Sequence, residues 1–186
     1  MDITSKNSEF LQRCKNTQCF KLIFNEEDLL KTSYVSCHQY FNYFWNIYEK
    51  YKSQFKQINN RDINNTYNGQ AFSIIITYLI TREGIEIFAM DEDIGVPFVK
   101  PDIVIKKQDK QMIFLSLKTS LRERWKQADW EAIKFKKKYK GAFCYLLSNN
   151  FSEIKNIKKN LHWLDLDNIY NTSEVDLNHL FNEIKK

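Results

Sequence analysis

Gln111-Met-Ile-Phe-Leu-Ser-Leu-Lys118, followed at once by Thr-Ser-Leu-Arg-Glu-Arg-Trp-Lys-Gln127, is the part of the chain that determines its architecture. Side chains on a strand point alternately to its two faces, so Ser116 and Lys118 would share one face of a strand over residues 111–118. Beyond residue 124, apolar residues recur every three to four positions, which is typical of an amphipathic helix. We therefore expect a buried strand that ends in a charged residue and leads into a long helix.

Outward from this stretch, short apolar runs predict strands over 85–90, 101–106, 142–147 and 162–166. Helical spacing predicts helices in residues 8–58 and over 70–81, 152–160 and from about 173 onward. The predicted fold class is α/β: a mixed β-sheet flanked by helices, with a helical subregion at the N-terminus. We expect one domain over 1–186, made of a helical part (1–67) and an α/β core (68–186), because low Gly and Pro content leaves no clear linker.

The net charge of +5 is concentrated in one window of the sequence. Residues 121–140 hold eight Lys or Arg and three Asp or Glu, so their surplus (8 − 3 = 5) equals that of the whole chain. A basic surface of this kind suits a polyanion such as nucleic acid, because binding releases the counterions of the phosphates. A solvated helix face would have the same composition, and the two interpretations stay open at this point.

Cysteine usage and the terminal sequence bear on the cellular compartment. Cys14, Cys19, Cys37 and Cys144 lack the spacing of a disulfide scaffold, and buried reduced thiols are favoured over a zinc site that would include His38. The first residues show no secretion signal, and the longest apolar run, 74–80, is too short to cross a bilayer. A cytoplasmic protein without a membrane partner is expected.

Two acids and one lysine suggest a metal site. Asp102 lies among β-branched residues, where a carboxylate is costly to bury unless it is paired with a cation, and Lys118 could supply that charge. Glu131 lies thirteen residues after Lys118, on the same helix face as Arg124 and Gln127. Asp102 and Glu131 could hold Mg²⁺, and Lys118 could then orient a water. A plain ion pair at the end of a sheet is the alternative.

Pro101-Asp102, Ser116-Leu117-Lys118 and Glu131 together resemble the PD-(D/E)xK nuclease superfamily. Ser116 stands where that family usually has its second acid. One branch, the type II restriction endonucleases that cut CC/GG-containing sites, is similar in carrying this acid on the following helix, thirteen residues after the lysine. The segment 118–127 also resembles the signature of that branch. The resemblance covers about residues 69–166.

The resemblance implies a restriction-endonuclease-like fold and Mg²⁺-dependent cleavage of double-stranded DNA at a short C/G-containing site, with Asp102, Lys118 and Glu131 as catalytic residues. It also implies that Arg122, Glu123 and Arg124 read bases. Their chemistry agrees, because arginine can donate two hydrogen bonds to guanine and glutamate can accept one from cytosine. A charged, solvated helix start is the alternative interpretation of this triplet.

The resemblance further implies a homodimer acting on a two-fold site, and a DNA methyltransferase that protects the host. The family often adds an acid from the helix before the first strand, but this chain has Gln70 and Ser73 there. Residues expected to contact the DNA backbone or to support the site are Gln70, Gln127, Lys134, Lys137 and Lys138. Two other functions stay open: a DNA repair or junction-resolving nuclease, and a non-cleaving DNA-binding module on a degenerate nuclease scaffold.

Overall fold

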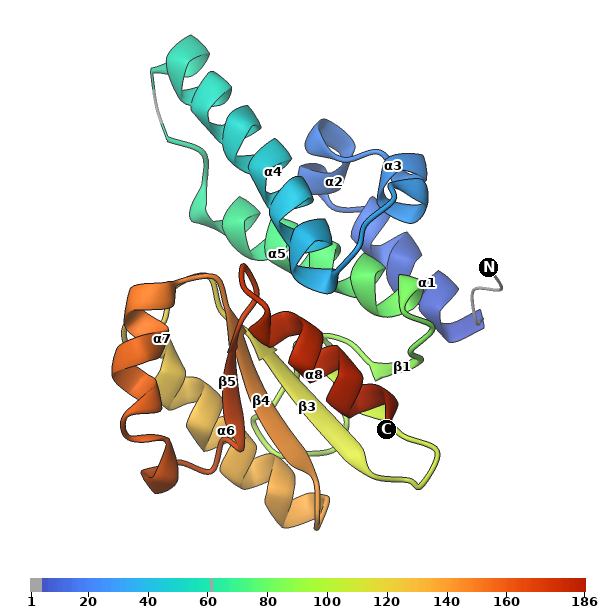
Figure 1. Ribbon diagram of the computed structural model, residues 1–186, viewed down its shortest axis with the longest axis vertical. Helices are drawn as coiled ribbons and strands as arrows, with labels where there is room; N and C mark the ends of the chain where they lie inside the picture. Colours follow the sequence, from blue (N-terminus) through green and yellow to red (C-terminus); the bar gives the residue numbers. More distant parts are fainter. Residues whose placement is uncertain (1–4, 61) are drawn as a thin grey trace.

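The computed structural model describes residues 5–60 and 62–186 and contains a five-stranded sheet in the order β1-β2-β3-β4-β5 (Figure 1). The pairs β1–β2 and β2–β3 are antiparallel, whereas the pairs β3–β4 and β4–β5 are parallel. The predicted mixed sheet is therefore confirmed. The strands are Ile87–Ala89, Ile103–Lys106, Met112–Leu117, Phe143–Ser148 and Asn168–Asn171.

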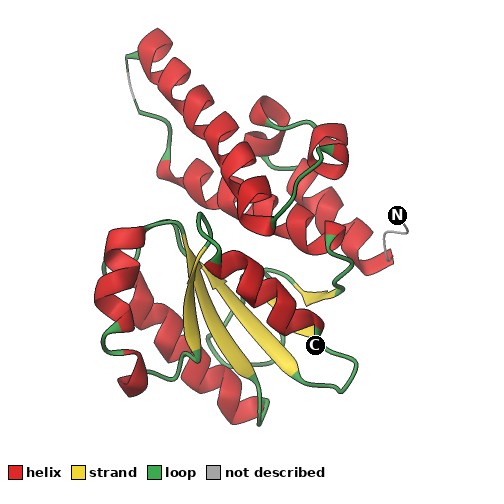
Figure 2. Ribbon diagram, in the orientation of Figure 1, coloured by secondary structure: helices red, strands yellow, loops and turns green. Residues whose placement is uncertain are grey.

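Helices form a separate N-terminal layer and also cover both faces of the sheet (Figure 2). The N-terminal layer contains α1 (Ser5–Lys15), α2 (Gln18–Ile23), α3 (Glu26–Lys31), α4 (Cys37–Asn59) and α5 (Asn65–Arg82). The remaining helices are α6 (Arg124–Lys138), α7 (Phe151–Lys158) and α8 (Asp176–Lys185), with a 3₁₀ turn at Leu161–Trp163. The predicted helical N-terminal region is thus present in the described residues.

β3 has the alternation that its sequence predicts. Ile113 and Leu115 belong to one core cluster, which they share with the N-terminal helices and α8. Phe114 belongs to a second cluster, on the opposite face, with α6 and α7. Ser116 and Lys118 follow Phe114 on the same face by the two-residue period. The strand therefore directs Lys118 toward the layer that contains α6.

The predicted strand over residues 162–166 is wrong. Residues 161–163 form a 3₁₀ turn and the strand lies later, at 168–171. The backbone before it is bonded by a side chain instead of a neighbouring strand: Asp129 Oδ1 accepts from the N–H groups of Asp165 (2.7 Å) and Leu166 (3.2 Å). Alternation of apolar residues could not reveal this, because the partner is a side chain from a distant helix.

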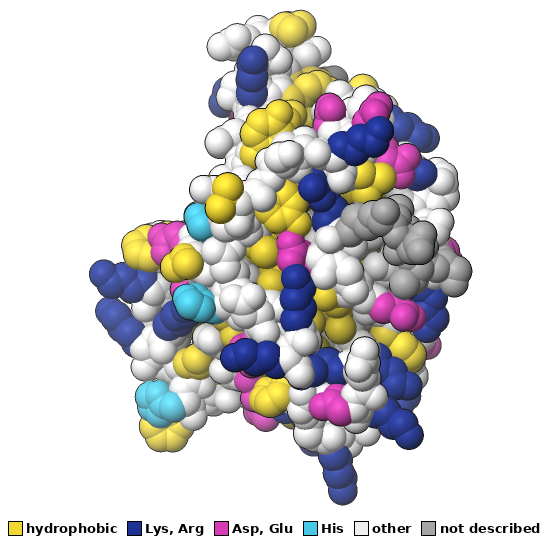
Figure 3. Space-filling view, turned by 45° about the vertical axis from the view of Figure 1, so that its right-hand side comes forward, with side chains coloured by type: hydrophobic (Ala, Val, Ile, Leu, Met, Phe, Trp, Pro, Cys, Tyr) yellow, Lys and Arg dark blue, Asp and Glu magenta, His cyan; other side chains and the backbone are white. Residues whose placement is uncertain are grey.

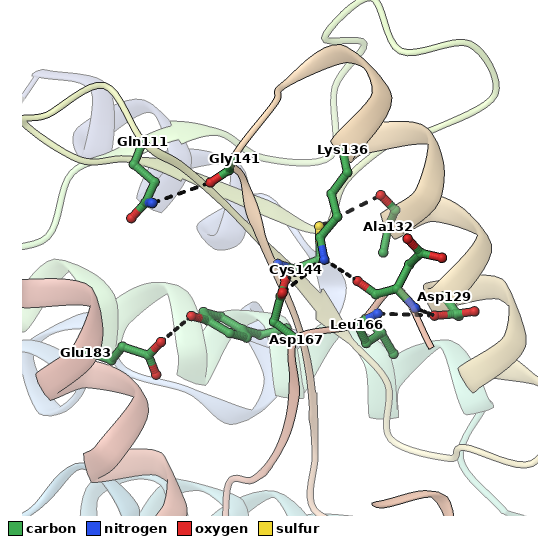
Figure 4. Close-up of polar contacts among 11 residues, drawn as sticks. Gln111, Asp129, Ala132, Lys136, Gly141, Cys144, Leu166, Asp167 and Glu183 are labelled. Atoms are coloured by element: carbon green, nitrogen blue, oxygen red, sulfur yellow. Dashed lines mark hydrogen bonds and ion pairs between the residues drawn. The ribbon is translucent and has the colours of Figure 1, made fainter. Parts of the chain in front are cut away.

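Polar contacts fasten α6 to the segment between the 3₁₀ turn and β5 (Figure 4). In addition to Asp129, Lys136 Nζ donates to the carbonyl of Asp165 at 2.6 Å and lies 2.9 Å from Asp167 Oδ2. Asp167 Oδ2 in turn accepts from the N–H of Cys144 at 2.7 Å. The helix that carries Glu131 is therefore held to the sheet by hydrogen bonds as well as by its apolar face.

On the face drawn in Figure 3, lysine and arginine side chains are scattered over the surface, with acidic side chains between them. Positive charge on this face is therefore not gathered in a single patch.

None of the helices in the described ranges is both long and apolar enough to cross a membrane.

Candidate active site

Asp102 and Lys118 meet at one end of the sheet. β2 and β3 are antiparallel with Ile103 opposite Leu115, so the residue before β2 comes beside the end of β3. Lys118 Nζ lies 2.8 Å from Asp102 Oδ2. The Leu117 N–H also donates to this oxygen at 2.8 Å, and the Ser116 hydroxyl donates to it at 3.4 Å. The structure thus places the first acid and the lysine together.

The Asp102–Lys118 pair is partly buried. The Lys118 side chain is 10% exposed and that of Asp102 is 34% exposed. Every hydrogen bond and ion pair of Asp102 within the described chain uses Oδ2, which leaves Oδ1 without a protein partner. Asp102 therefore combines one oxygen that fixes its position with a second that can bind a ligand from outside.

Glu131 comes to this site from α6. Its residue is 6% exposed, and its Oε1 accepts a hydrogen bond from Gln127 Nε2 at 2.8 Å. Burial raises the pKa of Glu131, the charge of Lys118 opposes that rise, and the charge of Asp102 adds to it. Glu131 is therefore close enough to Lys118 and Asp102 for their charges to act on its pKa.

The donor set of this site fits a hard divalent cation. Glu131 Oε2, like Asp102 Oδ1, has no hydrogen-bond or ion-pair partner among the residues described, so each acid keeps one oxygen open. Residues 5–60 and 62–186 contain no group of three or more His, Cys, Asp or Glu that could enclose a metal. Mg²⁺ is commonly held by one or two carboxylates together with waters and a substrate phosphate, so two acids suffice.

The predicted reading triplet lies in the short turn between Lys118 and the body of α6. Arg122, Glu123 and Arg124 are all exposed, and Arg124 is the first residue of the helix. Glu123 is paired with Lys126 at 2.7 Å, although the Glu123 side chain is 83% exposed. An ion pair as exposed as this one is weak, so it can be exchanged for contacts with another molecule.

Gln127 and Gln70 have different surroundings. Gln127 donates to Glu131, so it supports the second acid, one of the roles that its sequence position suggests. Gln70 lies in α5 with a buried side-chain oxygen that has no partner among the described residues. No hydrogen bond joins Gln70 to Asp102, Lys118 or Glu131 within the described part of the chain. A supporting role for Gln70 therefore stays a prediction.

The lysines in the second half of α6 lie along the helix from Arg124, where the reading triplet ends. Lys138 is fourteen residues from Arg124, which corresponds to about 21 Å along a helix. Its ammonium group donates to the carbonyls of Ile94 (2.7 Å) and Gly95 (3.0 Å). Lys134 lies over the ring of Trp130, whereas Lys137 is exposed. Of these three lysines predicted to contact the DNA backbone, Lys138 already binds the loop that contains Ile94 and Gly95.

The four cysteines are free and buried. Burial raises the pKa of the thiols of Cys14, Cys19, Cys37 and Cys144 to about 12. They are therefore un-ionised at neutral pH and poor nucleophiles. The prediction of buried, reduced structural thiols is confirmed.

Glu153 is a residue near this site that the sequence analysis missed. Its Oε2 accepts from the N–H of Leu121 at 2.6 Å, immediately before the reading triplet. Asn150 and Glu153 have the spacing of an ordinary helix cap, so nothing in the sequence pointed to a partner thirty-two residues away.

Comparisons with known proteins place few constraints on this chain. No protein-family model matches it, and no curated protein is similar to it in sequence. Among solved structures it is similar to a restriction endonuclease PspGI–substrate DNA complex, with 18% sequence identity and a TM-score of 0.48. That similarity covers 91% of this chain and 80% of the other.

Proposed function

We propose that this protein is a sequence-specific, Mg²⁺-dependent endonuclease that hydrolyses double-stranded DNA, a type II restriction enzyme. The observation that supports the proposal is the Asp102–Lys118 ion pair at one end of the sheet, with the buried Glu131 of α6 within its electrostatic influence and one oxygen open on each acid. The exposed triplet at 122–124 begins only four residues after Lys118. A catalytic centre and a reading segment this close suit an enzyme whose cleavage depends on the bases it contacts.

In this proposal Asp102 and Glu131 hold the metal, and Lys118 orients the attacking water beside the phosphate. The cation supplies Lewis-acid chemistry: it makes that water more acidic and offsets the charge that builds on the phosphate. The chain itself keeps Asp102 in place through three hydrogen bonds and keeps Glu131 in place through Gln127 and the packing of α6.

We further propose that the protein acts as a homodimer in the cytoplasm. A two-fold DNA site is most simply cut by a two-fold protein. A methyltransferase would then protect the host DNA.

Ser116 supports one rival function. It is buried and occupies the position of the usual second acid, so a non-cleaving DNA-binding module is the alternative that this residue favours. A repair or junction-resolving nuclease is the other rival, and the exposed triplet at 122–124 argues against it, because such enzymes recognise the shape of DNA.

Incubation of the purified protein with mixed linear and branched duplex DNA and Mg²⁺ distinguishes the three functions. Discrete fragments with uniform end sequences are expected if the protein is a restriction enzyme. Nicks that follow DNA shape would indicate a junction nuclease. Salt-sensitive retention of intact DNA, with no breaks in Mg²⁺ or Mn²⁺, would overturn the catalytic proposal.

Arg122→Ala and Arg124→Ala are each expected to lower kcat/KM for the cognate duplex about 5- to 150-fold. A bidentate arginine–guanine contact discriminates by about 1–3 kcal/mol, and the alanine variant loses that contact. Cleavage rates on the cognate duplex and on duplexes with one changed base pair measure the effect. Arg13→Ala, in α1, provides the matched control. Equal losses on all duplexes would show that these arginines bind phosphate and do not read bases.

A further inference from the structure

The segment between Lys118 and the reading triplet is held at both ends by backbone N–H groups that donate hydrogen bonds. The two acceptors lie in β4 and α7, which follow one another in the chain. The Lys118 N–H donates to the carbonyl of Leu147 in β4 at 3.0 Å. The Leu121 N–H donates to Glu153 Oε2 in α7 at 2.6 Å. Because α7 follows β4 after a two-residue link, one continuous piece of chain, 147–153, fixes both ends of residues 118–121.

The carboxylate of Glu153 is diverted from the role that its position suggests. Asn150 caps α7 by accepting from the N–H of Glu153 at 3.2 Å. A glutamate at this position commonly returns the bond to the N–H of the cap residue. Here the Asn150 N–H donates to the Ser148 hydroxyl at 3.2 Å, and the Glu153 side chain reaches Leu121 instead.

The Leu121 N–H, which donates to Glu153, is buried and cannot reach water as an alternative partner. Leu121 is fully buried, with its side chain in the core cluster beneath α6, and its carbonyl accepts from the Trp125 N–H at 3.0 Å. Loss of the carboxylate would therefore leave a buried donor unpaired, and the turn would relax to satisfy it. The residues directly after Leu121 are the reading triplet.

We infer that Glu153 is a positioning residue that sets the reading triplet relative to Lys118. The inference rests on the proposed function, because it assumes that Arg122 and Arg124 contact bases. A carboxylate that accepts from a backbone N–H makes a charge-assisted bond, which is short and directional. Bidentate base contacts need accurate placement, so a loosened turn should weaken discrimination more than it weakens general DNA affinity.

The test compares Glu153→Ala and Glu153→Gln with wild type and with Glu174→Ala, which removes an exposed glutamate. Two ratios are measured between the cognate duplex and one with a single changed base pair: kcat/KM in Mg²⁺, and binding affinity in Ca²⁺. We expect both ratios to fall about 10- to 100-fold in Glu153→Ala. Glu153→Gln should stay close to wild type, because its amide oxygen can still accept from Leu121. Glu174→Ala should match wild type.

Thermal unfolding of each variant separates positioning from stability. Unchanged ratios in Glu153→Ala would overturn the inference, and so would an equal loss on both duplexes that parallels a lower unfolding temperature. A wild-type protein that discriminates in binding but never cuts would overturn the cleavage proposal, while the binding ratio would still test Glu153. A wild type that neither cuts nor discriminates would overturn both.

Discussion

Lys118→Met is expected to slow DNA cleavage about a thousandfold or more while leaving DNA binding nearly intact. The Lys118 ammonium is buried, and its partner is the oxygen of Asp102 that also accepts from the backbone. Charge stabilisation and water positioning at a phosphate are typically worth factors of this size. Methionine keeps the apolar stem of the lysine side chain in place, so the variant removes the charge with little change in packing.

Single-turnover cleavage and equilibrium DNA binding, measured on the same preparation, check this prediction. Lys31→Ala is the matched control, because Lys31 also forms an ion pair with an acid, Glu27, but on an exposed helix of the N-terminal layer. It should cut at the wild-type rate. Cleavage by Lys118→Met at the wild-type rate would show that the catalytic assignment is wrong, whatever the binding result.

The sheet and its polar end were predictable because their signals are local. The two-residue alternation of 111–118 fixed which face carries Lys118, and the cost of leaving Asp102 unpaired pointed to the lysine. The spacing of Glu131 from Lys118 placed the second acid on the helix that returns over that face. The first two inferences each used a short stretch of chain and one physical rule, whereas the role of Glu131 came from the resemblance to one branch of nucleases.

Contacts between distant side chains and the backbone could not be predicted in this way. Asp129 accepts from two amides near residue 165 and turned the expected strand at 162–166 into a 3₁₀ turn and a loop. Glu153 accepts from Leu121 although its spacing from Asn150 is that of a helix cap. Both acids are unremarkable in the sequence, because their partners are backbone groups that any residue could offer. Local patterns therefore revealed the catalytic candidates but not the residues that hold them in place.

Glu131→Gln and Asp102→Asn are each expected to reduce Mg²⁺-dependent cleavage about a thousandfold and to weaken metal binding. Each replacement keeps the shape of the side chain but removes the negative charge of an open oxygen, on which a hard cation depends. With only two acids at the site, neither loss can be compensated by a third carboxylate in the described chain. Glu86→Gln, at an exposed position before β1, should leave both properties unchanged.

Unfolding temperatures of Glu131→Gln and wild type show whether the variant has lost metal binding or has lost its fold. Burial raises the pKa of Glu131, so its charged form is disfavoured in the folded protein without a cation. Glu131→Gln should therefore unfold at the same temperature as wild type, or a higher one, in metal-free buffer near neutral pH. Added Mg²⁺ should raise the unfolding temperature of wild type but not of this variant, because only a ligand that binds the native state stabilises it. A Glu131→Gln protein that cuts DNA at the wild-type rate with an unchanged Mg²⁺ requirement would remove Glu131 from the metal site, since its charge would then have no part in holding the cation.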